Sequence, residues 1–141
     1  MSSAQKSAFV NIVLAICVLL IGVLVYLVDR QANSVYLIPS WMFIGNSGQP
    51  FLIIIGDHLP TFAHVYAFIL LTSLLPIPTD KNIVVICLFW FSFDSLFENI
   101  PTYFQSATFD ILELASIAVG TLAAYLTITT SSRRNYSHVY R

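Results

Sequence analysis

The sequence predicts an all-α membrane protein in which four transmembrane helices form one small bundle. Of the 141 residues, 57% are hydrophobic and only 9% are charged, and the mean hydropathy is +0.82. Soluble domains usually carry about 25% charged residues. A chain with so few charges cannot cover itself with a solvated surface, so we expect lipid around it. Its length leaves room for a single integral membrane domain over residues 1–141.

The first helix is expected over residues 8–28, where the sequence reads AFVNIVLAICVLLIGVLVYLV. This run is long enough to cross about 30 Å of hydrocarbon, and it is too long for the apolar part of a signal peptide. We therefore expect an uncleaved signal-anchor helix. Residues 29–50 contain several Gly and Pro and the aromatic segment 36–44, which we expect to lie at the membrane interface with Tyr36 and Trp41 among the headgroups.

The second and third helices are expected over residues 60–75 and 83–97. Gly56, Asp57 and Pro60 argue against an earlier start, because Pro favours the first position of a helix. The turn PIPTDKN separates the two helices. At roughly 15 residues, or about 22 Å, both are short for a membrane span.

The fourth helix is expected over residues 109–130, with a basic tail at 131–141. Ser116, Gly120 and Ala124 follow one another at intervals of four residues. Such a stripe of small side chains lets a neighbouring helix approach closely.

The basic residues predict the orientation of this topology. With four spans, five of the six Lys and Arg residues fall on one side of the membrane, and Arg30 alone falls on the other. The five are Lys6, Lys81, Arg133, Arg134 and Arg141. Because basic residues are concentrated on the cytoplasmic side of membrane proteins, both termini are predicted to be cytoplasmic.

The same topology brings polar side chains together under the outward surface. Five carboxylates and two imidazoles lie at the outward ends of helices two, three and four: Asp57, His58, His64, Asp94, Glu98, Asp110 and Glu113. Asp94 and Glu98 share a helix face, as do Asp110 and Glu113. A carboxylate facing hydrocarbon costs roughly 2.5 kcal/mol or more, so these groups are predicted to line a binding pocket inside the bundle.

Simpler interpretations of the same residues remain open. Asp110 is well placed to cap the fourth helix. Glu98 can be solvated above the membrane, and Asp57 and His58 can be ordinary loop residues. His64, Asp94 and Glu113 have apolar neighbours on both sides, so their alternative role is a structural hydrogen bond between helices.

Three kinds of chemistry fit such a set. Carboxylates and imidazole suit a divalent cation such as Zn, Mn or Fe. His64, Glu98 and Glu113 are the candidates for catalysis, with either glutamate as a general base and His64 as its proton partner. A proton-sharing network that locks the helices is the third. HExxH and GxSxG motifs are absent and Cys17 and Cys87 are isolated, so the sequence favours a protein that is not an enzyme.

Three segments resemble the VanZ-like family of small membrane proteins: HVYAFILL from His64, DSLFE at 94–98 and FDILELASIAVGTLAAY at 109–125. In the last of these, Glu113 precedes Gly120 by seven residues, as the final acid of that family precedes a glycine. Ile117 stands where the family commonly has Asn, and residues 99–109 lack its usual Arg. The resemblance implies an envelope-related role at the outward leaflet of a bacterial inner membrane.

The leading functional hypothesis is therefore an envelope protein whose outward acidic pocket engages a lipid-linked or amphipathic molecule. One alternative is a non-catalytic accessory subunit of a larger membrane complex, and another is a proton-coupled carrier that acts as an oligomer. The expected partners are membrane lipid and other membrane subunits or further copies of the chain. A net charge of −1 gives no reason to expect nucleic acid.

Overall fold

The computed structural model describes residues 3–29, 50–75, 80–99 and 110–137. These residues form four helices and no strands: α1 Ser3–Asp29, α2 Pro50–Thr72, α3 Asp80–Asn99 and α4 Ile111–Ser137. The all-helical fold and the number of helices are confirmed. The predicted interfacial segment 36–44 lies outside the described residues.

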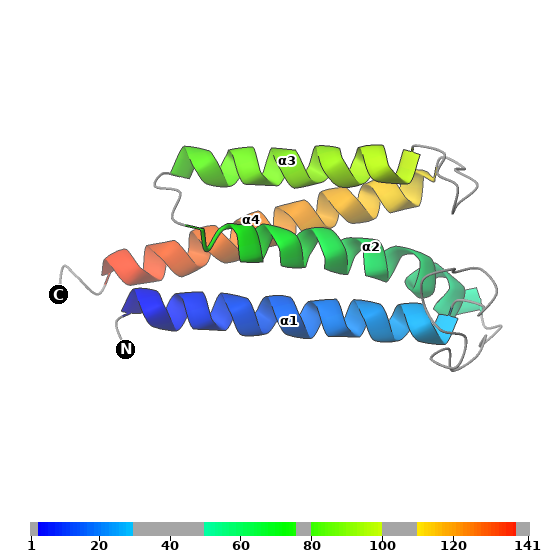
Figure 1. The fold of residues 1–141 in the computed structure, drawn as a ribbon, viewed down its shortest axis with the longest axis horizontal. Coiled ribbons are helices and arrows are strands. Elements are labelled where there is room, and N and C mark those ends of the chain that lie inside the picture. The colour runs from blue at the N-terminus through cyan, green and yellow to red at the C-terminus, as the bar shows by residue number, and fades with distance from the viewer. Residues whose placement is uncertain (1–2, 30–49, 76–79, 100–109, 138–141) are drawn as a thin grey trace.

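The helices lie along one another with alternating direction, so that the start of α1 and the end of α4 lie at the same end of the bundle (Figure 1). Helices α2 and α4 occupy the middle, with α1 and α3 on either side of them (Figure 1). The end of α1, the start of α2, the end of α3 and the start of α4 meet at the opposite end (Figure 1). This is the relative arrangement of helix ends that the sequence predicts.

The core is built largely around α2. Half of its ten residues come from this helix, and the others come from α1, α3 and α4: Ala15, Val65, Tyr66, Ala67, Ile69, Leu70, Cys87, Ile117, Ala124 and Ile128. Exposed large apolar side chains are instead numerous on α1, α3 and α4, while Leu75 is the only one among the described side chains of residues 55–75. Helix α2 is therefore the central helix of the bundle, and the other three helices display apolar side chains on the outer surface of the bundle.

The predicted start of the second helix is wrong. Helix α2 begins at Pro50 and continues through Gly56, Asp57 and Pro60. A proline inside a helix removes one backbone hydrogen bond and favours a bend. Figure 1 shows the first part of α2 inclined to the rest. The close packing of α1 against this part of α2 explains why the helix persists there.

Glycines allow that packing. A Cβ atom on Gly22 would lie 2.6 Å from the Cβ of Ala63 and 3.5 Å from the Cα of Pro60, so α1 and α2 touch almost backbone to backbone. A Cβ on Gly120 would lie 2.5 Å from Val65 Cγ1 and 2.9 Å from a backbone carbonyl of α2. The close approach predicted for the small-residue stripe of α4 is confirmed at Gly120.

The other boundaries agree with the sequence more closely. Helix α1 begins five residues before the predicted start, and α3 extends the predicted range at both ends. Helix α4 starts near the predicted residue and continues seven residues past Thr130 into the basic tail. Once nucleated, a helix propagates readily through polar residues, which accounts for this extension.

Two of the helices are long and apolar enough to cross a membrane, over Gln5–Val28 and Ile111–Ser131. As whole helices, α2 with 23 residues and α3 with 20 are longer than the predicted spans of roughly 15 residues. Their apolar stretches are nevertheless short, over His58–Thr72 and Asn82–Leu96. Length and composition thus support a membrane location through two helices.

Candidate functional site

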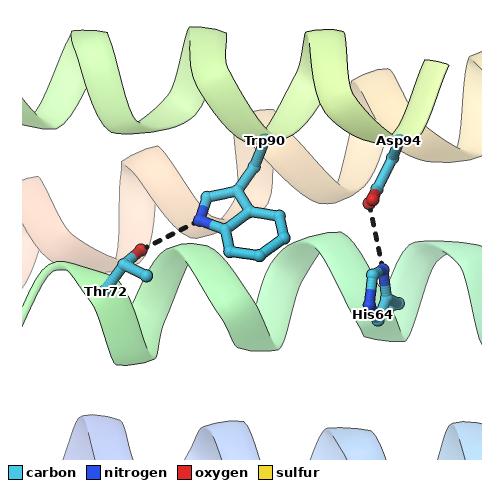
Figure 2. Close-up of polar contacts among 4 residues, drawn as sticks. All are labelled: His64, Thr72, Trp90 and Asp94. Carbon is cyan, nitrogen blue, oxygen red and sulfur yellow. Dashed lines mark hydrogen bonds and ion pairs between the residues drawn. The ribbon is translucent and has the colours of Figure 1, made fainter. Parts of the chain in front are cut away.

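Two of the predicted site residues form a direct contact between α2 and α3. The Nδ1 atom of His64 lies 3.2 Å from the Oδ2 atom of Asp94 (Figure 2). Because an ionised carboxylate only accepts hydrogen bonds, Nδ1 is the donor to it. Thirty residues separate the two side chains in sequence, and the antiparallel packing of α2 and α3 brings them together.

The two members of this pair differ sharply in burial. Asp94 is only 4% exposed, whereas the imidazole of His64 is 43% exposed. The carboxylate is thus buried between helices, and the imidazole that contacts it reaches the surface of the bundle. Within the described part of the chain, the second ring nitrogen of His64, Nε2, has no hydrogen-bond partner.

Aromatic rings surround the imidazole. The ring of Phe68, one turn along α2, lies 4.5 Å from that of His64, and Trp90 presents its edge at 6.1 Å. Trp90 donates a hydrogen bond of 3.1 Å from Nε1 to the hydroxyl of Thr72 (Figure 2). That hydroxyl in turn donates to the carbonyl of Phe68. Two polar contacts, one turn or more apart, therefore join α2 to α3.

Asp110 caps α4. Its Oδ1 atom accepts a hydrogen bond of 2.8 Å from the backbone N–H of Leu112, and its backbone carbonyl accepts one from Leu114. These contacts satisfy backbone groups that have no partner inside the first turn of a helix. The simpler interpretation of Asp110 as a helix cap is confirmed.

The remaining predicted residues belong to helix segments at the expected end of the bundle. Glu113 is half-buried in the first turn of α4. His58 is half-buried on α2, and its buried Nδ1 has no hydrogen-bond partner among the described residues. Asp57 belongs to α2 and Glu98 to α3, but the positions of their side chains lie outside what the structure describes.

The described residues contain no group of three or more His, Cys, Asp or Glu that could hold a metal ion. His64 and Asp94 alone would supply two ligands. Zinc and other transition ions in proteins usually take at least three protein ligands. The described residues do not supply a donor set that fits the divalent cation considered from the sequence.

Several other polar contacts could not be identified from the sequence. Besides the Trp90–Thr72 bond, Tyr66 on α2 and Thr127 on α4 form a hydrogen bond of 3.1 Å between their hydroxyls. Asn11 is 6% exposed on α1, and its Oδ1 has no partner in the described part of the chain. The sequence signal for these contacts is a polar residue within an apolar run. This signal indicates that the side chain is buried, but it does not identify the residue to which the side chain is hydrogen-bonded.

An aspartate that accepts from Nδ1 fixes the orientation of an imidazole and leaves Nε2 to meet another molecule. In its neutral form this ring accepts a hydrogen bond or a proton at Nε2, and in its protonated form it donates there. The pair can therefore bind a polar group or exchange a proton, and both uses need access to His64.

Comparison with known proteins gives no match to any family model, to curated proteins or to solved structures. The resemblance to the VanZ-like family stays a prediction.

Proposed function

We propose that the protein is an integral membrane protein that binds the polar part of an amphipathic molecule at the His64–Asp94 pair. The observation that carries this proposal is the combination of a buried carboxylate with a half-exposed imidazole hydrogen-bonded to it. A purely structural pair would gain from burying both members, because exposed interactions contribute little. Here the imidazole is left accessible beside a buried charge.

The outside of the bundle supports a membrane location for all four helices. Large apolar side chains are exposed along α1, α3 and α4, with fractions between 37% and 62%. So many exposed large apolar side chains are expected on a protein surrounded by lipid. An amphipathic molecule dissolved in the same bilayer can reach His64 laterally, with its apolar part in lipid and its polar group at the ring.

The orientation proposed from the sequence follows from charge. The helix ends that carry Lys6, Lys81, Arg133 and Arg134 lie together, at the end opposite the acidic residues. We propose that this basic end is cytoplasmic. A reporter that is active only in the cytoplasm, fused to either terminus, is expected to be active; activity of an exported reporter at both termini would reverse the orientation.

Native mass spectrometry of the protein purified in mild detergent tests the binding function. We expect a co-purified amphipathic molecule that is retained by the unmodified protein and lost in His64→Ala. The matched control is Tyr66→Phe, which removes one hydrogen bond between helices on the side of α2 that faces α4. Equal retention by both variants would refute binding at the pair. Stoichiometric co-migration with larger membrane proteins, with no bound amphiphile, would favour the accessory-subunit alternative.

A further inference from the structure

Charge at the His64–Asp94 pair restricts the ligand. On α2 there is no Lys or Arg, and Lys81 on α3 is 13 residues from Asp94, which corresponds to about 20 Å along a helix. A neutral imidazole donates a hydrogen bond to Asp94 without cancelling its charge. With no Lys or Arg of α2 or α3 near the pair, an anion placed there would face a buried carboxylate in a medium of low dielectric constant.

A set of aromatic rings from α2 and α3 adjoins the pair. We call it the aromatic surface and define it as Phe68, Phe89, Trp90 and Phe93. Trp90 lies at its centre, with ring centroids 4.8 Å from Phe68, 5.4 Å from Phe89 and 5.6 Å from Phe93. Phe89 is 58% exposed and Phe93 is 46% exposed. This surface is open to whatever surrounds the bundle.

Aromatic faces attract organic cations through the quadrupole of the ring, more strongly where water is excluded. A metal ion would need several oxygen, nitrogen or sulfur ligands, and the described residues offer no group of three. An organic cation needs only a negative charge and a set of ring faces. The aromatic surface and Asp94 supply both, and His64 lies between them.

From these contacts we propose that the ligand is a lipophilic organic cation, whose charged centre binds near the His64–Asp94 pair and whose apolar part lies on the aromatic surface. This inference rests on the proposed function and names the class of molecule that the same pair would take. The positive centre gains from Asp94 and from the rings together, and the apolar part of the molecule keeps it in the bilayer from which it enters.

Tetraphenylphosphonium and tetraphenylborate test this proposal, because they have nearly the same size and shape and opposite charge. Binding of each ion is measured by equilibrium dialysis against the protein in phosphatidylcholine nanodiscs, with empty nanodiscs as the baseline. The chain has two tryptophans, so Trp41→Phe leaves Trp90 as the single fluorescent reporter within the aromatic surface. Its emission shows whether the dialysed ion binds there.

We expect saturable binding of the phosphonium with a change in Trp90 emission, and no saturable binding of the borate. Asp94→Asn keeps an acceptor for His64 Nδ1 and removes the charge, so the affinity should fall at least tenfold. Tyr66→Phe should stay within twofold of the unmodified protein. Phe93→Leu, on the exposed part of the aromatic surface, should weaken binding severalfold and serves as a second variant should Asp94→Asn not fold, as judged by circular dichroism.

Three results would overturn the proposal. Saturable binding of the borate that depends on His64 would show that the pair takes anions, leaving the proposed function intact and this inference wrong. Phosphonium binding that is unchanged in both Asp94→Asn and Phe93→Leu would place the cation elsewhere. If neither ion binds saturably to folded protein, the ligand is not a lipophilic cation, and the mass spectrometry of the co-purified amphiphile decides the proposed function separately.

Discussion

Removal of His64 alone is expected to destabilise the bundle more than removal of both His64 and Asp94. A hydrogen bond between helices in a membrane contributes about 0.6 kcal/mol on average and up to about 1.7 kcal/mol. Leaving a buried acceptor without its hydrogen-bond donor costs about 1–3 kcal/mol, and more where the acceptor is charged. Asp94 is 4% exposed, so the second effect applies to it when the imidazole is lost.

Two features of the structure moderate that cost. The pair has a long separation of 3.2 Å and an imidazole that is 43% exposed, and the carboxylate can take up a proton once its partner is gone. We therefore expect His64→Leu to lower the free energy of unfolding by about 2–3 kcal/mol. Adding Asp94→Leu removes the stranded carboxyl group, so the double variant should lose only about 1 kcal/mol or less. Asp94→Asn keeps an acceptor for His64 Nδ1, so it should cost no more than one hydrogen bond, about 0.6 kcal/mol.

The assay is reversible unfolding of the purified protein in mixed micelles of rising SDS content, followed by circular dichroism at fixed temperature. The order of stability is the decisive result, because it does not depend on the absolute scale. If the double variant is less stable than His64→Leu, Asp94 does not depend on His64 for its burial, and the reasoning about the pair is wrong.

Three further predictions concern the helix contacts. Gly120→Ala should lower the unfolding free energy by about 1–3 kcal/mol, because its Cβ would lie 2.9 Å from a backbone carbonyl of α2. The control Ala118→Val, on the exposed side of α4, should change the unfolding free energy little. Equal losses in the two variants would refute close packing at Gly120. Tyr66→Phe should cost about 0.6 kcal/mol through loss of its bond to Thr127, measured in the same SDS titration, and an effect above 3 kcal/mol would contradict the loss of a single hydrogen bond. Asp110→Ala should lower the unfolding free energy by about 1 kcal/mol, and Asp110→Asn should lower it much less, because Asn also caps helices. Similar losses of stability in the two variants would argue against capping.

The sequence predicted the helices well where apolar runs have clear limits. For α1, α3 and α4, a single run of hydrophobic side chains fixes the helix, and errors at the ends reflect polar residues that a helix also accommodates. The start of helix α2 was predicted ten residues too late, because Gly56, Asp57 and Pro60 are read as local signals for a break. Contact with α1 overrides these signals, and a contact across 38 residues, from Gly22 to Pro60, leaves no trace in the local pattern.

The sequence predicted which helix ends carry the candidate site residues, but it did not predict which of these side chains face one another. Topology places His64, Asp94, Asp110 and Glu113 near one end of the bundle. Which side chains meet depends on the rotation of each helix about its axis, and adjacent residues differ by about 100°. That rotation is set by the packing of small residues such as Gly120, so the sequence could not distinguish the His64–Asp94 pair from the cap formed by Asp110.

The attachment of α3 connects the candidate site to the stability of the bundle. In lipid, apolar side chains gain little by leaving the bilayer for a neighbouring helix, so packing and polar contacts hold helices together. Helix α3 exposes much of its apolar surface, and the His64–Asp94 and Thr72–Trp90 hydrogen bonds join it to α2. A ligand that competes with the imidazole for Asp94 would remove one of them. Binding at the pair and retention of α3 against α2 thus depend on the same carboxylate.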